Sequence, residues 1–380
     1  MSGPATALTA RKRSGVYSVW VAALGDPGRS DVQARTARML RLQAGACRQL
    51  GSPLYGDLLL HAADDLQAGG LLADVLDGFL DDQVKSALAL RLLGGVHAIV
   101  LSGRAPALAA FYPSVGGTPE RRRGSPRAWA ALQQVLAEFG GEVRPWLDHP
   151  PQTNEVGRAA ALLGGLRYIA AETSLPLRLV EVGASAGLNL RADWFCVPGS
   201  AGSYGDPRSP VVLADGWLGD APPDSPIEVV ERIGGDLAPI DPLTDDGRLR
   251  LTAYIWPDQA ERLARLRGAL TIAARAPAEL RTESATDTTA RTSLVAGTWT
   301  VLWHSIFRQY LDEAQRAELA AGVAGLGAAA TAQARFAYLY LEPSRAGGCR
   351  VTLTTWPGEH RRVLGSAPAH GLPVHWHTSA

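Results

Sequence analysis

The chain has 380 residues, of which 46% are apolar and 7% aromatic. This composition excludes a disordered protein, and the length exceeds that at which a single hydrophobic core usually stops growing. The 37 basic residues balance 37 acidic ones, which gives a formal net charge of +0. Neutrality argues against nucleic acid or an anionic membrane as a partner, so we expect a small-molecule substrate.

Three cysteines, Cys47, Cys196 and Cys349, lie far apart and form no CxxC pair. Their spacing indicates neither a disulfide framework nor a zinc site. No apolar signal-peptide segment follows the basic residues 11–13, and the most apolar stretch, residues 88–101, is too short to span a bilayer. We therefore expect a cytoplasmic protein.

Residues 1–28 are rich in Ser, Gly, Ala and Arg, and we expect them to be only partly ordered. Residues 29–174 carry helical patterns, with Ser-Pro helix starts at 52–53 and 125–126. We expect this stretch to form an all-helical N-terminal domain. Such a domain would act as a lid and would shape the substrate pocket.

The hydrophobic period changes at residue 177, where a short strand is predicted over 177–182. A glycine-rich turn and a helix follow this strand. Further strands are predicted at 227–230, 249–255, 298–303, 336–341, 350–355 and 373–377, and helices at 259–274 and 312–326. Alternating strands and helices predict an α/β fold over 175–380, a Rossmann-like domain with a mostly parallel sheet. The last two strands are expected to form an antiparallel edge hairpin, and a second hairpin is expected as an insertion near 194–226.

The glycine-rich turn, residues 181–187, reads EVGASAG. Glycines let the backbone approach a ligand closely, and a helix N-terminus offers free N–H groups. The spacing is that of the first motif of Rossmann-like methyltransferases, with Ser185 in place of the middle glycine, and it fits neither a dinucleotide motif nor a P-loop. We expect this turn to bind S-adenosylmethionine; a tight turn without a ligand is the structural alternative. The candidate binding residues here are Glu181, Gly183, Ser185, Gly187 and Asn189.

A second acid is expected after the next strand, where it would bind the ribose hydroxyls as in dinucleotide folds. Asp236 is the first candidate, and Glu231 is the alternative. The stretch 256–259, WPDQ, follows a predicted strand and opens a helix, for which Pro and Asp are ordinary starting residues. The functional interpretation places Trp256 or Tyr254 against the adenine or near the sulfonium, and Asp258 on the adenine amino group.

His304 follows the strand predicted at 298–302, and the carboxyl ends of such strands face the ligand crevice of an open α/β sheet. We expect His304 to act as a catalytic base; a buried histidine that fixes the next helix is the alternative. Tyr310 is expected to line the same pocket, and Glu342, which closes another strand, is a candidate of the same kind.

The polar stretch 152–155, QTNE, stands just before a helix, where Asn154 and Glu155 are also ordinary capping residues. In the functional interpretation, Asn154 and Arg158 bind the ligand and Glu155 takes part in proton transfer. His375 and His377 share one face of a strand, but no further residue has the spacing of a ligand. We therefore expect no metal.

With these residues in view, the chain resembles the family known as domain of unknown function 2332, over residues from about 40 to 355. The motifs that carry the resemblance are Ser52-Pro53-Leu54-Tyr55, Phe111-Tyr112-Pro113-Ser114, the segment 152–158, the segment 181–189, Trp256-Pro257-Asp258-Gln259 and Trp303-His304-Ser305. The resemblance implies a divergent branch of the S-adenosylmethionine-dependent methyltransferase fold and the same ligand. It implies no particular reaction.

Two classes of function follow from these expectations. The first is an enzyme that transfers the activated methyl group to a small molecule, and a variant of it uses the same ligand for cyclisation of the aminobutyl moiety. The second is a non-catalytic S-adenosylmethionine-binding protein, which the serine at position 185 and the long insertion favour. The sequence leaves the acceptor and the oligomeric state open.

Overall fold

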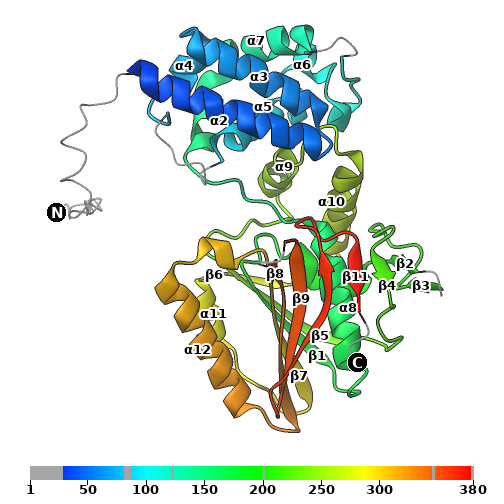
Figure 1. Cartoon of the computed structure of the whole chain (residues 1–380). Helices are drawn as coiled ribbons and strands as arrows, with labels where there is room; N and C mark the ends of the chain where they lie inside the picture. The colour runs from blue at the N-terminus through cyan, green and yellow to red at the C-terminus, as the bar shows by residue number, and fades with distance from the viewer. Residues whose placement is uncertain (1–28, 81–86, 121–123, 200–201, 345–346, 378–380) are drawn as a thin grey trace, which may run out of the picture.

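The computed structural model describes residues 29–80, 87–120, 124–199, 202–344 and 347–377, so the segment 1–28, expected to be partly ordered, lies outside it. A group of helices lies above an α/β body, and α9 and α10 lie between them (Figure 1). None of the helices in the described ranges combines the length and apolar character needed to cross a membrane.

The first part of the chain is helical. Its elements are α2 (Arg29–Gln49), α3 (Pro53–Gln67), α4 (Leu71–Val75), α5 (Leu88–Leu101), α6 (Pro106–Ala109), η2 (Pro113–Val115), α7 (Pro126–Val143) and η3 (Arg144–Leu147). Pro53 and Pro126 begin α3 and α7 as predicted, because proline at the first helical position loses no hydrogen bond. One hydrophobic cluster joins these helices and includes Leu58, Leu92 and Leu132.

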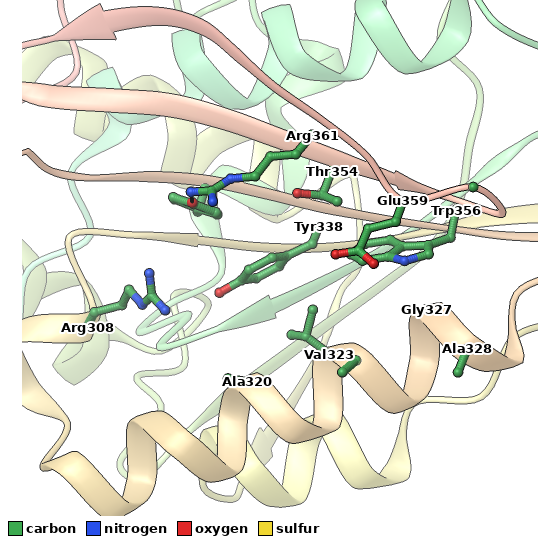
Figure 2. Close-up of a pocket in the computed structure, with 13 residues that line it drawn as sticks. Arg308, Ala320, Val323, Gly327, Ala328, Tyr338, Thr354, Trp356, Glu359 and Arg361 are labelled. Carbon is green, nitrogen blue, oxygen red and sulfur yellow. Dashed lines mark hydrogen bonds between the residues drawn. The ribbon is translucent and has the colours of Figure 1, made fainter.

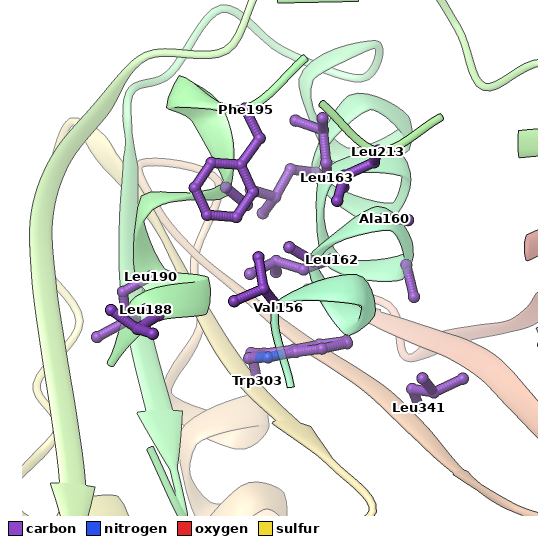
Figure 3. Close-up of a cluster of buried hydrophobic side chains, with 14 of the residues drawn as sticks. Val156, Ala160, Leu162, Leu163, Leu188, Leu190, Phe195, Leu213, Trp303 and Leu341 are labelled. Carbon is purple, nitrogen blue, oxygen red and sulfur yellow. The ribbon is translucent and has the colours of Figure 1, made fainter. Parts of the chain in front are cut away.

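The next helical elements, η4 (Val156–Arg158) and α8 (Ala159–Ala170), pack on the sheet. Figure 3 shows Ala160 and Leu163 of α8 in one buried cluster with Trp303 of the sheet. Gly164 and Gly165 permit this approach, since a Cβ at either position would overlap a side chain of the sheet. We expected the helical domain to extend to residue 174 and thus to include α8. In the structure, α8 instead shares the hydrophobic core of the sheet.

In the described part of the chain, nine strands form the main sheet, in the order β4-β11-β10-β9-β8-β7-β1-β5-β6. Their bounds are β1 (Leu177–Val182), β4 (Trp217–Gly219), β5 (Val229–Asp236), β6 (Glu279–Thr282), β7 (Thr298–Ser305), β8 (Ala334–Pro343), β9 (Cys349–Trp356), β10 (His360–Ala367) and β11 (Val374–Trp376). The strands β6, β5, β1, β7 and β8 are parallel, whereas β9, β10 and β11 add antiparallel pairings. The predicted α/β class with a mostly parallel sheet is confirmed.

The two faces of the sheet have different covers. On one face lie α8, η5 (Leu188–Trp194) and α10 (Ala260–Ala273); on the other lie α11 (Ala285–Arg291) and α12 (Glu313–Ala329) (Figure 1). Side chains of a strand alternate between the faces. Accordingly, Leu179 of β1 belongs to the core on the α8 face, and Val180 belongs to the core on the α12 face.

Several elements differ from the predictions. The stretch 249–255, predicted as a strand, lies in and just after the helix α9 (Asp245–Ala253), because the Thr244 side chain caps that helix upstream. The helix expected after the glycine-rich turn is the short 3-10 helix η5.

The predicted pairing of the last two strands is also wrong. The unpredicted strand β10 separates β9 from β11 and pairs with both. Its first residues, His-Arg-Arg, hide the alternation that would reveal a strand, and β6 is equally polar. Within the expected insertion, β2 (Val197–Gly199) and β3 (Gly202–Tyr204) form an antiparallel hairpin.

The contact between α8 and the sheet yields a first prediction. A Cβ at Gly164 would overlap the Trp376 ring, so Gly164→Ala should lower the free energy of unfolding by about 1–3 kcal/mol. Gly45 of α2 is the matched control, because nothing lies within 4 Å of its Cβ position. Gly45→Ala should raise stability by about 0.5–1 kcal/mol. Urea unfolding measures both changes, and equal effects would contradict the close packing of α8.

Candidate functional site

The topology of the sheet locates the site. The chain runs from β1 to β5 on one side and from β7 to β8 on the other, so the direction of winding reverses between β1 and β7. Ligands of open α/β sheets bind at such a switch point, outside the carboxyl ends of the strands. Here three acids stand on adjacent parallel strands: Glu181 in β1, Asp236 at the end of β5 and Glu283 just after β6.

The glycine-rich turn is fastened to the end of β5. Gly183, Ser185 and Gly187 all have positive φ values, of 68°, 53° and 61°. The backbone N–H of Gly183 donates to the carbonyl of Gly235 at 2.9 Å, and that of Ser185 donates to Oδ2 of Asp236 at 2.9 Å. A left-handed serine costs about 1–3 kcal/mol, and such strain is typical of ligand-binding turns.

Asp236 is the better placed of the two acids considered for the ribose. Its Oδ1 accepts hydrogen bonds from Ala238 N at 2.9 Å and from Gln152 Nε2 at 3.3 Å, beside the turn. Glu231 lies further back in β5, where its carboxylate is paired with Arg178 at 2.6 Å. The structure thus favours Asp236 by position.

Within the described ranges, four buried polar atoms at the strand ends, in the turn and in η5 have no hydrogen-bond partner: Glu181 Oε2, Ser185 Oγ, Asn189 Oδ1 and Glu283 Oε1. Buried polar groups are nearly always paired, because an unpaired one loses its hydration without compensation. Unpartnered acceptors on three neighbouring segments are therefore groups that a bound ligand with several donors would satisfy.

Glu181 is the most deeply placed of the acids, with 2% of its surface exposed. Its Oε1 accepts a hydrogen bond from Trp303 Nε1 at 3.1 Å. Burial raises the pKa of Glu181 from 4.5 to about 8, against the opposing effects of this hydrogen bond and of the Arg191 and Arg158 charges. The carboxyl group is thus mostly neutral at pH 7 until a cation approaches it.

The polar segment 152–158 holds the turn from the opposite side. Asn154, predicted to bind the ligand, accepts through its Oδ1 from the backbone N–H of Leu188 at 2.7 Å and so caps η5 at the end of the turn. The side chain of Asn189 donates to the backbone carbonyl of Glu155 at 3.4 Å. This leaves Asn189 Oδ1 without a donor.

Glu155 is buried and Arg158 is half-buried near the same turn. Burial alone would raise the pKa of Glu155, but the His370 hydrogen bond and the Arg262 charge, 2.6 Å away, outweigh it and lower the pKa to about 2. A carboxylate that stays ionised does not suit the predicted proton transfer. Arg158 donates to the carbonyl of Ser305 at 3.3 Å, at the end of β7.

Trp256, Tyr254 and Asp258 do not lie at a strand end, because the strand predicted before them is the helix α9. Trp256 belongs to the helical core and packs against Tyr55, with ring centroids 6.3 Å apart. Asp258 Oδ2 accepts from Leu54 N at 3.2 Å and so caps α3. These residues join the helices to each other. Their predicted contact with the adenine assumed a strand over 249–255, where the structure has the helix α9.

His304 lies on the α12 face of the sheet, opposite to Glu181. It is fully buried, and both ring nitrogens have partners: Nδ1 with Glu342 Oε1 at 2.8 Å and Nε2 with Tyr338 Oη at 2.7 Å. This arrangement matches the alternative of a structural histidine. Tyr310, in η6 (Arg308–Tyr310), is 73% exposed.

Phe307 was not singled out in the sequence, and it covers the turn. A Cβ at Gly183 would overlap the Phe307 ring, while Leu280 and Leu190 lie 2.8 and 3.2 Å from the Cβ position of Gly187. Both glycines of the turn are therefore in contact with side chains. Glu283 was also missed, because the short polar strand before it gave no periodic signal.

The comparisons with known proteins give one family. A family model described as an uncharacterized protein conserved in bacteria (DUF2332) matches residues 37–376. The chain belongs to this family, and the resemblance inferred from its motifs is confirmed. Neither a curated protein nor a solved structure matches the chain.

This DUF2332 member has three cysteines. Cys47, Cys196 and Cys349 are all buried. Across the described ranges, no group of three or more His, Cys, Asp or Glu side chains is arranged to hold a metal ion.

Burial of Glu181 yields a second prediction. Its folded pKa of about 8 lies above its ordinary value of 4.5, so the folded state holds a proton that the unfolded state has lost between these pH values. Stability should then fall as the pH rises from 4.5 to 8, by a few kcal/mol in total. Glu181→Gln should remove this contribution to the slope. Urea unfolding at pH 5, 6.5 and 8 measures it, with Glu231→Gln as control; a slope unchanged in Glu181→Gln would contradict the assignment.

Proposed function

We propose that this protein binds S-adenosylmethionine at the carboxyl ends of β1, β5 and β6 and transfers its methyl group to a small molecule. The observation that carries the proposal is the row of acids on these adjacent strands, together with four buried polar atoms that lack partners. The parallel strand order supports it. Numbered along the parallel part of the sheet, β6-β5-β1-β7-β8 is the order 3-2-1-4-5 of Rossmann folds.

Each acid suits one part of this ligand. Glu181, beside the turn, would bind the cationic amino group, and Asp236 would bind the ribose hydroxyls. Glu283, one strand further along, would accept from the adenine amino group. The orphaned oxygens of Glu181 and Glu283 fit such donors, and Ser185 and Asn189 offer further acceptors.

When bound, the ligand supplies a methyl group already activated on a sulfonium. The chain then has to position the acceptor in line with that methyl group and exclude water from the site. We assign no general base to His304 or Glu155, because the partners of each are already in place within the protein.

Because His304 and Glu155 are both bonded to other groups of the protein, a second candidate is also favoured, a non-catalytic S-adenosylmethionine-binding protein. A base for an acceptor that must lose a proton is missing from the two positions predicted for it. Cyclisation of the aminobutyl moiety is the other outcome to be tested, since it uses the same ligand.

The proposal predicts binding that depends on the acids. Calorimetric titration should show that S-adenosylmethionine and its demethylated product bind the native chain. Glu181→Gln and Asp236→Asn should each weaken binding about tenfold or more, because each removes a hydrogen bond to a charged group. Glu231→Gln, which alters the carboxylate paired with Arg178, should bind normally.

Absence of binding by both compounds would refute the proposal. Mass analysis of the ligand after incubation with candidate acceptors then separates the three possible activities. The demethylated product indicates transfer, a shortened nucleoside indicates cyclisation, and unchanged ligand indicates a binder.

Contact between Phe307 and Gly183 predicts that this ring slows ligand entry. Phe307→Ala should raise the association rate of S-adenosylmethionine several-fold, as measured by stopped-flow fluorescence. Phe139→Ala removes a partly buried ring from the helical core and serves as the control for a lost phenyl group. An association rate that is the same in Phe307→Ala and the native chain would show that the ring does not obstruct the turn.

A further inference from the structure

A cavity of about 550 Å³ lies between α12 and the strands β8, β9 and β10. Its volume is within the range of small-molecule sites. It opens on the α12 face of the sheet, whereas Glu181 shares the other face with Trp303 and α8. The cavity is thus a different place from the site of the proposed function.

Two arginines line one end of the cavity. Figure 2 shows Arg308 and Arg361 near the hydroxyl of Tyr338, with Trp356 and Glu359 at the far end. In the part of the chain that the structure describes, the ion pairs include no carboxylate bound to either guanidinium group. Arg361 Nη2 donates to Tyr340 Oη at 3.0 Å, and Arg308 lies 5.7 Å from the centroid of the Tyr340 ring. An anion would supply the missing counter-charge.

Tyr338 presents an acceptor in the middle of the cavity. Burial would raise the pKa of Glu342, but its bond to His304 and the N–H groups of Phe307 and Arg308 outweigh this and lower it. The ionised Glu342 accepts a hydrogen bond from Nδ1–H of His304, and in the neutral imidazole the opposite nitrogen, Nε2, accepts a hydrogen bond from the Tyr338 hydroxyl. The lone pairs of this oxygen then face the cavity.

Apolar side chains, most of them small, form much of the remaining cavity wall. Helix α12 contributes the small side chains of Ala320, Ala324 and Ala328 and the larger Val323. The indole of Trp356 closes the far end, where Glu359 stands beside it (Figure 2). An apolar wall that ends at an indole suits a ligand with an aromatic ring, which can pack against the alkyl side chains and meet the edge of the indole.

We propose that this cavity binds a small carboxylic acid that carries a planar ring. The carboxylate lies between Arg308 and Arg361, and the ring lies against Ala320 and Val323 of α12, on the arginine side of Trp356. A hydroxyl or amino substituent on the ring donates to Tyr338 or Glu359. This inference does not rest on the proposed function, because it uses the other face of the sheet.

The test is calorimetric titration of the full chain with naphthalene-2-carboxylate, its uncharged amide and acetate. The acid should bind about tenfold more tightly than the amide, which has the same ring without the charge. Acetate, which has the charge without the ring, should bind more weakly than either. Saturating S-adenosylmethionine should not displace the acid, which separates this result from that for the other site.

Three variants test whether the two arginines and the cavity itself bind the acid. The double variant Arg308→Gln and Arg361→Gln should bind acid and amide equally, and Ala320→Phe, which fills the cavity from an exposed position, should bind neither. Arg362→Gln changes the neighbouring arginine of β10, which pairs with Glu172, and should leave binding of the acid unchanged. Equal binding of acid and amide by the native chain, no binding of either, or a preference for the acid over the amide that persists in the double variant would overturn the proposal.

Discussion

The arrangement of the candidate site depends on one buried carboxyl group. Glu181 is enclosed where β1 meets the glycine-rich turn, and burial holds its pKa near 8. A carboxyl group in such a place is stable only while it is neutral or compensated by a cation. The single hydrogen bond from Trp303 satisfies one oxygen and leaves the other free. The fold thereby keeps a group whose charged form needs a partner that the protein does not provide.

Hydrogen bonds join the segments around this group. Asp236 holds the turn through Ser185, and Asn154 holds the start of η5 through Leu188. The segment 152–158 precedes the first strand of the sheet, yet it contacts the turn. This explains why α8 packs with the sheet: a helix that began in the other core could not bring Asn154 to Leu188.

The two faces of the sheet separate two kinds of chemistry. On the α8 face, unpartnered acceptors suit a ligand with cationic and donor groups. On the α12 face, Arg308 and Arg361 suit an anion. His304 and Glu181 stand close to the carboxyl ends of adjacent strands, but their side chains point to opposite faces. Because side chains alternate between the faces along β7, His304 lies on the α12 face. There it is hydrogen-bonded to Tyr338, which lines the cavity.

The sequence alone determined the α/β class, the place of the glycine-rich turn and the family, because these follow from local hydrophobic periods and from motifs in fixed order. Only the tertiary structure decided which face each strand residue occupies, since period-two alternation does not say which helix covers which face. The tertiary structure also decided the position of Trp256, because the apolar pattern before it predicted a strand where the helix α9 forms. It likewise decided the positions of Glu283 and β10, because β6 and β10 are polar and become strands by pairing with their neighbours.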